Sequence, residues 1–263
     1  MYLFLSDLHL GRGTAAESRA AERDALSLLR AHEADVRAAG RDGGLYLVGD
    51  VFDQFIEYRR LVPKGFARLQ GLLAAWTDAG VPVTYVVGNR DPWHLDYFEH
   101  ELGVRVVPDG TAARLAGRET YIAHGDGLVP TERAYNRLKP LLRHPLPYRL
   151  YRNLFPGDWG YRLARYIARR GSGAPDAPTV DALRDAARRR LTGSTDLVVF
   201  GHGHRAEHTD GPDGTYLNPG YWFGARTFGR IDADGPALFR WTEGCAQPLA
   251  APAAESFQPV SAL

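Results

Sequence analysis

Short apolar runs alternate with longer amphipathic segments through the first half of the chain. The runs predict buried β-strands at Tyr2–Leu5, Leu45–Val48, Val83–Val87, Tyr121–Ala123 and Leu197–Phe200. Amphipathic segments at about 18–39 and 63–79 follow the first two strands and predict helices. Strands that alternate with helices are typical of a parallel sheet. The sequence therefore predicts an α/β fold.

The alternation stops after His124. Residues 128–192 contain helical patterns divided by prolines and glycines, which predicts an inserted helical cap. Strand patterns resume at residue 197 and continue at 214–217, 226–231 and 237–241. The last residues, 244–263, are mainly Ala, Pro, Gln and Ser, and we expect a loosely ordered tail. Residues 1–243 would then form one domain that includes the cap.

The amino-acid composition gives information about the size of the core and the cellular compartment. A chain of 263 residues with 44% hydrophobic content can bury a large core. A single cysteine, Cys245, excludes an internal disulfide and is consistent with a reducing compartment. The chain starts directly in a predicted strand, and no apolar stretch reaches the length of a membrane span. We therefore expect a cytoplasmic protein.

The net charge of +1 hides a strongly basic cap. Between residues 128 and 170 only Glu132 and Asp158 are acidic, against ten cations: Arg133, Arg137, Lys139, Arg143, Arg149, Arg152, Arg162, Arg165, Arg169 and Arg170. Aromatic and aliphatic residues interleave with these charges. A basic amphipathic surface of this kind can bind anionic lipid, and could also hold acyl chains between its helices. A solvated charged face over an ordinary helical core is the alternative.

Side chains that bind metals follow the five predicted strands. They are Asp7, His9, Asp50, Asn89, His124, His202 and His204. Strand ends gather along one edge of a sheet, so we expect these side chains to meet there. Carboxylate, imidazole and amide ligands without a thiolate admit manganese, iron or zinc. Two cations about 3.5–4 Å apart need a shared ligand, for which Asp50 is the natural candidate, and such pairs commonly catalyse displacement at phosphorus.

Five ordered motifs resemble the signature of the calcineurin-like metallophosphoesterases. They are Asp7-Leu8-His9, Gly49-Asp50-Val51-Phe52-Asp53, Gly88-Asn89-Arg90-Asp91, His124-Gly125-Asp126 and Gly201-His202-Gly203-His204. The resemblance implies a sandwich of two sheets flanked by helices. It also implies that one cation is held by Asp7, His9, Asp50 and His204, and the other by Asp50, Asn89, His124 and His202. We expect two divalent cations, with manganese favoured and iron or zinc possible.

Within that superfamily the chain is most similar to the UDP-2,3-diacylglucosamine pyrophosphohydrolases of lipid A synthesis. The shared features are Ser6–Leu10, Arg90 where His is commoner, Tyr135, Arg143-His144-Pro145 and Ile167–Arg170 before Ser172. Pro130-Thr131-Glu132 replaces that family's Thr-Asp-Asp, and Gly203 replaces its usual Thr. The resemblance places Glu132 and Tyr135 on the substrate side of the site. Arg12, close after the first ligands, is a further candidate for a phosphate contact.

Arg90 gives information about the bond that is cleaved. An alkoxide leaving group needs a proton donor such as His, and arginine cannot give up its proton. A phosphate monoester, whose second pKa is about 6, can leave without protonation. Arg90 would then neutralise charge on the transferred group. The sequence therefore favours P–O–P over P–O–C cleavage, although a salt bridge to Asp91 or Asp53 is an alternative role for Arg90.

Four functions remain open. The favoured hypothesis is a pyrophosphatase at the cytoplasmic membrane face that hydrolyses a nucleotide-linked lipid to UMP and an acylated sugar 1-phosphate, with Asp50, Asn89, Arg90 and His124 at the reacting centre. A phosphatase or phosphodiesterase acting on soluble nucleotides or phosphoproteins is the second. A nuclease is less favoured because of Arg90, and nucleic acid and protein partners are not expected. A metal-stabilised scaffold that binds a membrane or an acidic partner is the non-enzymatic alternative.

Overall fold

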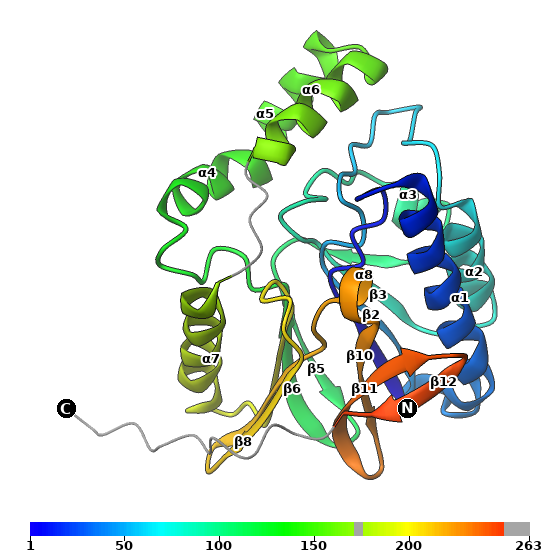
Figure 1. The fold of residues 1–263 in the computed structure, drawn as a ribbon, viewed down its shortest axis with the longest axis vertical. Coiled ribbons are helices and arrows are strands. Elements are labelled where there is room, and N and C mark those ends of the chain that lie inside the picture. Colours follow the sequence, from blue (N-terminus) through cyan, green and yellow to red (C-terminus); the bar gives the residue numbers. More distant parts are fainter. Residues whose placement is uncertain (171–175, 250–263) are drawn as a thin grey trace.

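Two β-sheets stack face to face at the centre of the molecule, and helices cover their outer faces (Figure 1). The computed structural model describes residues 1–170 and 176–249, without the side chains of 167–170. The first sheet has seven strands in the order β12-β11-β10-β1-β2-β3-β4, and the second has five in the order β5-β6-β7-β9-β8. This two-sheet sandwich is the architecture that the sequence predicts.

The strands of the first sheet are β1 (Tyr2–Leu5), β2 (Gly44–Val48), β3 (Val83–Val86), β4 (Arg105–Val107), β10 (Thr227–Asp232), β11 (Gly235–Thr242) and β12 (Cys245–Pro248). Those of the second sheet are β5 (Thr111–Leu115), β6 (Arg118–Ala123), β7 (Leu197–Phe200), β8 (Glu207–Gly211) and β9 (Gly214–Asn218). Strands β1 to β4 run parallel, as do β6, β7 and β9. The predicted ligands follow the carboxyl ends of β1, β2, β3, β6 and β7.

The core lies in three layers. Between the sheets, Phe4 and Val86 of the first sheet pack in one cluster with Ile122 and Val199 of the second. Helices α1 (Ala15–Ala38) and α2 (Ala67–Asp78) bury their apolar residues against the other face of the first sheet. Because the central strands are covered on both faces, their sequences are continuous apolar runs.

Helix α7 (Ala177–Leu191) changes the expected extent of the cap. Its buried side chains Leu183, Ala187 and Leu191 pack against Val198 and Phe200 of the second sheet. This helix is therefore an outer layer of the sandwich, because it supplies the apolar cover that the second sheet requires. The cap consists of α4 (Arg133–Arg143), α5 (Pro145–Leu154) and α6 (Gly157–Arg170), of which α5 and α6 project from the body (Figure 1). The predicted cap over residues 128–192 included α7, which belongs to the sandwich.

The end of the chain also differs from the expected loose tail. Residues 245–248 form β12, which pairs antiparallel with β11 from Thr242↔Cys245 to Phe239↔Pro248. Backbone pairing holds this segment although its composition is poor in strand-forming residues. The remainder of the predicted tail, residues 250–263, lies outside the described residues.

Helix boundaries follow local chemistry. Helix α1 begins at Ala15, earlier than the apolar pattern predicts, because Thr14 and Glu17 form a reciprocal capping box. Helix α2 begins at Ala67, after Phe66 in the left-handed region, so the segment from Pro63 is a loop. The short helices α3 (Tyr97–His100) and α8 (Trp222–Ala225) complete the described fold.

Within the described residues, no helix is both long and apolar enough to cross a membrane.

A buried histidine makes the fold sensitive to acid. His94 stacks on Phe55 at 4.9 Å and meets Tyr85 and Phe98 edge-on, with both ring nitrogens buried. Burial lowers the pKa of His94 to about 4. The unfolded chain, in which histidine has a pKa of about 6.5, then binds this proton more readily than the folded one. His94 therefore costs stability as the pH falls from about 6.5 toward 4.

We predict that His94→Phe removes part of this acid sensitivity. Between pH 7 and pH 5, the variant should lose about 1–2 kcal/mol less unfolding free energy than the original protein, because phenylalanine keeps the ring packing and has no proton to bind. Urea unfolding at the two pH values measures the difference. His100→Phe, at a histidine whose side chain is 74% exposed, is the matched control. Identical pH dependence in all three proteins would contradict the assignment.

Candidate metal centre

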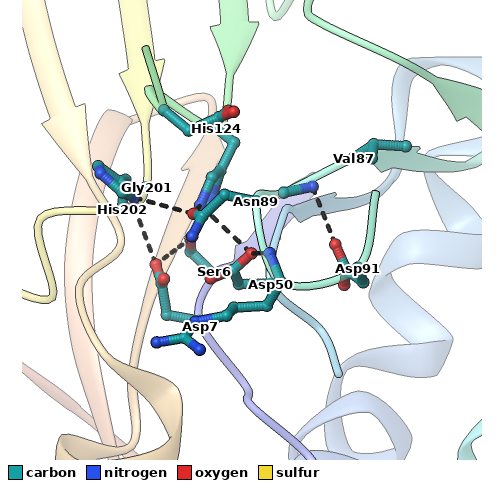
Figure 2. A network of polar contacts seen from close by, with 12 residues as sticks. Ser6, Asp7, Asp50, Val87, Asn89, Asp91, His124, Gly201 and His202 are labelled. Atoms are coloured by element: carbon teal, nitrogen blue, oxygen red, sulfur yellow. Dashed lines mark hydrogen bonds and ion pairs between the residues drawn. The ribbon is translucent and has the colours of Figure 1, made fainter. Parts of the chain in front are cut away.

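All seven predicted ligands come together where parallel strands of both sheets end. Figure 2 shows Asp7, Asp50, Asn89, His124 and His202 around this centre. Five of the seven ligands have a positive φ between 41° and 63°: Asp7, His9, Asp50, His202 and His204. This conformation is uncommon for residues other than glycine and costs about 1–3 kcal/mol for each residue. The turns after the strands are therefore strained in a way that aims these side chains at a common centre.

The first group consists of Asp7, His9 and His204. His9 Nε2 lies 3.0 Å from His204 Nε2, and Asp7 Oδ1 lies 3.5 Å and 3.2 Å from these two nitrogens. Asp7 Oδ1 is buried and has no hydrogen-bond partner. A buried carboxylate oxygen without a partner, facing two imidazole nitrogens, fits a divalent cation at this position.

The second group surrounds Asn89. Its Oδ1 lies 3.1 Å from His124 Nε2 and 3.1 Å from His202 Nδ1. Asp50 connects the groups, since its Oδ2 is 3.7 Å from His9 Nε2 while its Oδ1 is 3.5 Å from His124 Nε2. One oxygen of Asp50 thus faces each group, as a carboxylate that bridges two cations would. Figure 2 shows Asp50 between Asp7 and Asn89.

The charge balance of this site also fits bound cations. Burial raises the pKa of Asp50 to about 6, although the neighbouring His124 opposes the shift. Asp7 and Asp91 contribute to the rise because their charges repel that of Asp50. Divalent cations would relieve this repulsion and keep both ligand carboxylates ionised.

Supporting contacts fix which atom each ligand presents. Ser6 Oγ and the backbone N–H of His202 donate to Asp7 Oδ2, at 2.5 Å and 3.0 Å, and leave Oδ1 to the site. His124 Nδ1 lies 2.9 Å from the carbonyl oxygen of Val48, so Nδ1 must carry the proton and Nε2 presents its lone pair. Asp91 accepts from the backbone N–H groups of Gly88 and Phe52 and so braces the turn before Asn89.

Three glycines allow the turns to approach one another. A Cβ on Gly49 would overlap the His124 ring, one on Gly88 would overlap the Asp50 carboxylate, and one on Gly201 would overlap Ser6 Oγ. Any side chain at these positions would therefore displace a ligand or its support. The glycines beside the ligands are required by this close packing.

The predicted substrate residues occupy mixed positions. Arg12 donates to Asp53 at 2.8 Å and lies 3.4 Å from the Tyr221 hydroxyl, beside His9 and His204. The Arg90 backbone N–H donates to Asp50 Oδ1 at 2.8 Å, which places this residue at the edge of the centre. Glu132 and Tyr135, by contrast, contact protein groups that support the ligands.

Glu132 Oε1 lies 2.9 Å from His202 Nε2, so this carboxylate orients a metal ligand and leaves His202 Nδ1 to face Asn89. The Tyr135 hydroxyl donates to Asp126 Oδ2 at 2.6 Å. In the described structure both side chains thus act behind the ligands, whereas the sequence suggested the substrate side. Asp53 Oδ1 lies 3.6 Å from His9 Nδ1 and so also supports a ligand.

Arg143 is the main contact between cap and centre. From the end of α4, its Nη2 donates to the carbonyl oxygens of Val87 and Gly88, at 3.2 Å and 3.0 Å, and to Asp126 Oδ2 at 3.1 Å. Lys139 Nζ lies 3.1 Å from the same carboxylate oxygen. Burial alone would raise the pKa of Asp126, but His124, Arg143 and Lys139 lower it overall. A cap helix therefore holds the turn that presents Asn89.

Tyr221 was not identified by sequence reasoning. Its ring stacks on His204, with centroids 4.3 Å apart and planes 9° from parallel. The next residue, Trp222, packs in the core instead, buried with its indole N–H donating to the Ala21 carbonyl. The turn at Asn218-Pro219-Gly220 was the available signal, since it returns the chain to the strand ends.

Comparison with known proteins identifies the family. Residues 2–206 match the model of the calcineurin-like phosphoesterases, which covers most of the chain. The protein belongs to that family. This confirms the predicted family and fold, and the chain is a metal-dependent phosphoesterase whose family implies divalent metal ions.

Similar proteins give a more specific likeness. A UDP-2,3-diacylglucosamine hydrolase from Porphyromonas gingivalis is 36% identical over 166 residues, covering 63% of this chain and 61% of that protein. Another from Neisseria meningitidis is 32% identical over 245 residues, covering 88% of this chain and 94% of that protein. Among solved structures, the phosphoesterase Yfce from E. coli aligns with a TM-score of 0.45 at 14% identity, covering 93% of this chain and 95% of that one.

We predict that Asp50→Ala reduces metal content and phosphoesterase activity together, because it removes the ligand that faces both groups. Activity should fall by more than the roughly 10–100-fold typical of losing a supporting residue. Elemental analysis after manganese loading should approach two metals per chain for the original protein, as expected for a shared-carboxylate pair, and clearly less for the variant. Asp78→Ala, at an exposed aspartate of α2, is the control. Normal turnover by Asp50→Ala would refute the bridging role.

Proposed function

We propose that this protein hydrolyses the pyrophosphate bond of UDP-2,3-diacylglucosamine, or of a similar nucleotide-linked lipid, to UMP and an acylated sugar 1-phosphate. The hydrolases from P. gingivalis and N. meningitidis support this substrate through their likeness to the chain. The observation that carries the proposal within the site is the position of Arg90, which directly follows Asn89 and whose backbone N–H donates to Asp50 Oδ1.

Two divalent cations, with manganese favoured, would lower the pKa of a water molecule at the site, so that a hydroxide is available near neutral pH. The residues of the chain do the rest. Asp7, Asp50 and the four histidines would hold the cations, and Asn89 would add a neutral oxygen between His124 and His202. Arg90 neutralises charge on the transferred phosphoryl oxygens, which is sufficient for a pyrophosphate because its leaving group needs no proton.

The surface of the cap supports the proposal of a lipid substrate and of a location at the cytoplasmic face of a membrane. Leucines of its helices expose apolar surface, with Leu146 65% and Leu154 63% exposed. Exposed cations, Arg149 and Arg162, lie among them. Exposed apolar groups flanked by cations are suited to the interface of an anionic bilayer. The lone Cys245 is free and exposed, which accords with a reducing compartment.

We predict that Arg90→His lowers turnover of UDP-diacylglucosamine by about 100-fold or more, since a charge-stabilising donor is lost from the transition state. Turnover of an alkyl phosphodiester should fall much less, because histidine can protonate an alkoxide. The ratio of the two kcat/KM values measures the effect, and Arg90→Lys, which keeps the charge, is the control. Equal losses on both substrates would show that Arg90 only holds the site together.

We also predict that replacing Arg149 and Arg162 by Gln weakens binding to anionic vesicles by roughly tenfold or more, since each cation near the surface contributes about 1 kcal/mol. These two arginines are exposed, whereas Arg152 lies over the Tyr148 ring at 4.4 Å and has a packing role. Vesicle co-sedimentation at increasing salt measures the effect.

Replacement of the exposed Arg30 and Arg189 by Gln makes the same change in charge on α1 and α7 and should have little effect. If the cap variant keeps full activity on the lipid substrate and binds vesicles normally, the cap is an ordinary helical cover. A soluble nucleotide would then be the better candidate substrate.

A further inference from the structure

An exposed loop outside the cap carries the same combination of apolar and basic residues. It lies between β2 and α2, and its tip contains Arg59, Arg60, Leu61, Val62 and Lys64, all exposed. The side chain of Leu61 is 62% exposed and that of Val62 is 37% exposed. Backbone hydrogen bonds in both directions between Tyr58 and Leu61 close the tip, so the two apolar side chains are presented by an ordered turn.

This loop lies against the start of α6. A Cβ on Gly157 would be 3.5 Å from Leu61 Cδ1, and one on Gly160 would overlap the Tyr58 hydroxyl. Tyr151 of α5 donates to the carbonyl oxygen of Gly160, which extends the contact to the neighbouring helix. Figure 1 shows the loop and α6 at the same end of the molecule, opposite the N-terminus.

The exposed faces of α5 and α6 continue the character of the loop. Leu146, Leu150 and Leu154 are spaced by one helical turn on α5, and α6 exposes Trp159 at 72% and Tyr166 at 55%. Arg149 and Arg162 are exposed on the same two helices. In segments 58–64 and 145–166, which the structure describes in full, Asp158 is the sole acidic residue.

We propose that the loop at residues 59–64 and the outer faces of α5 and α6 form one surface that binds an anionic lipid bilayer. Leu61 and Val62 insert below the headgroups, while Arg59, Arg60 and Lys64 remain at headgroup level. The proposal rests on the membrane location given above and adds an anchor on the sandwich itself. Large exposed apolar side chains ringed by cations, with almost no acid, match the chemistry of such a surface.

Two attachment points have a geometric consequence. The loop leaves β2 just after Asp50 and Asp53, and α6 lies against it. A bilayer that contacts both would hold the sandwich in one orientation, with the ends of the parallel strands toward the lipid. Binding through α5 and α6 alone would not fix that orientation.

The test is the double variant Leu61→Ser and Val62→Ser, which removes apolar surface without changing charge. Its partitioning onto phosphatidylglycerol vesicles should fall by about tenfold or more, since each buried aliphatic side chain contributes substantially. The salt dependence should persist, because the cations remain. Leu128→Ser, at a leucine 39% exposed and remote from the loop in sequence, is the matched control and should bind as the original protein does.

A second measurement follows Trp159 directly. Brominated phosphatidylglycerol vesicles should quench its fluorescence, and Trp159→Phe should abolish most of the quenching, because Trp76, Trp222 and Trp241 are buried and Trp93 is partly buried against the rings of Tyr148 and Tyr151. Unchanged partitioning of a folded double serine variant, or no quenching, would overturn the proposal. So would loss of self-association without loss of vesicle binding, which would assign the surface to a second copy of the chain. If the unmodified protein hydrolyses the lipid in detergent but does not bind vesicles, the proposed membrane surface is wrong and the proposed reaction still stands.

Discussion

The repulsion between two buried carboxylates is the constraint on which the rest of the structure depends. Asp7 and Asp50 sit with almost no solvent at the ends of neighbouring parallel strands, and each is tied on one oxygen by hydrogen bonds. The strained turns, the adjoining glycines and the imidazoles around them all serve to hold this charge density. Bound cations would offset this repulsion. The fold therefore gathers negatively charged ligands at the position where phosphoryl transfer needs cations.

The sequence could predict the α/β layout and the ligands because both follow from local patterns, whereas the two-sheet sandwich was implied by the family resemblance. Doubly covered strands are continuous apolar runs, and each ligand stands directly after one of them. The short strands β4, β5, β8 and β12 could not be predicted, since pairing with a neighbour rather than composition defines them. Helix α7 resembled the cap in sequence, and only its packing on the second sheet separates the two.

The supporting residues were harder to predict than the ligands for a similar reason. Glu132, Tyr221 and Arg143 are far in sequence from the groups they contact, so no local spacing reveals their roles. Side-chain contacts across 70 residues, as between Glu132 and His202, depend on tertiary packing alone. Residue types at fixed spacing identify what binds a metal, whereas the orientation of those groups is a property of the assembled fold.

The hydrogen bonds from Arg143 to Val87 and Gly88 make the cap and the metal centre one thermodynamic unit. A displacement of α4 would alter the turn that presents Asn89, and any ligand that favours one position of α4 would thereby change the affinity for the second cation. Such linkage is reciprocal, so metal loading would in turn change the preferred position of the cap. The position of the cap and the metal affinity of the centre are then coupled through Arg143, with Glu132 and Lys139 beside it, and a version of the chain without its cap would not be a simpler enzyme.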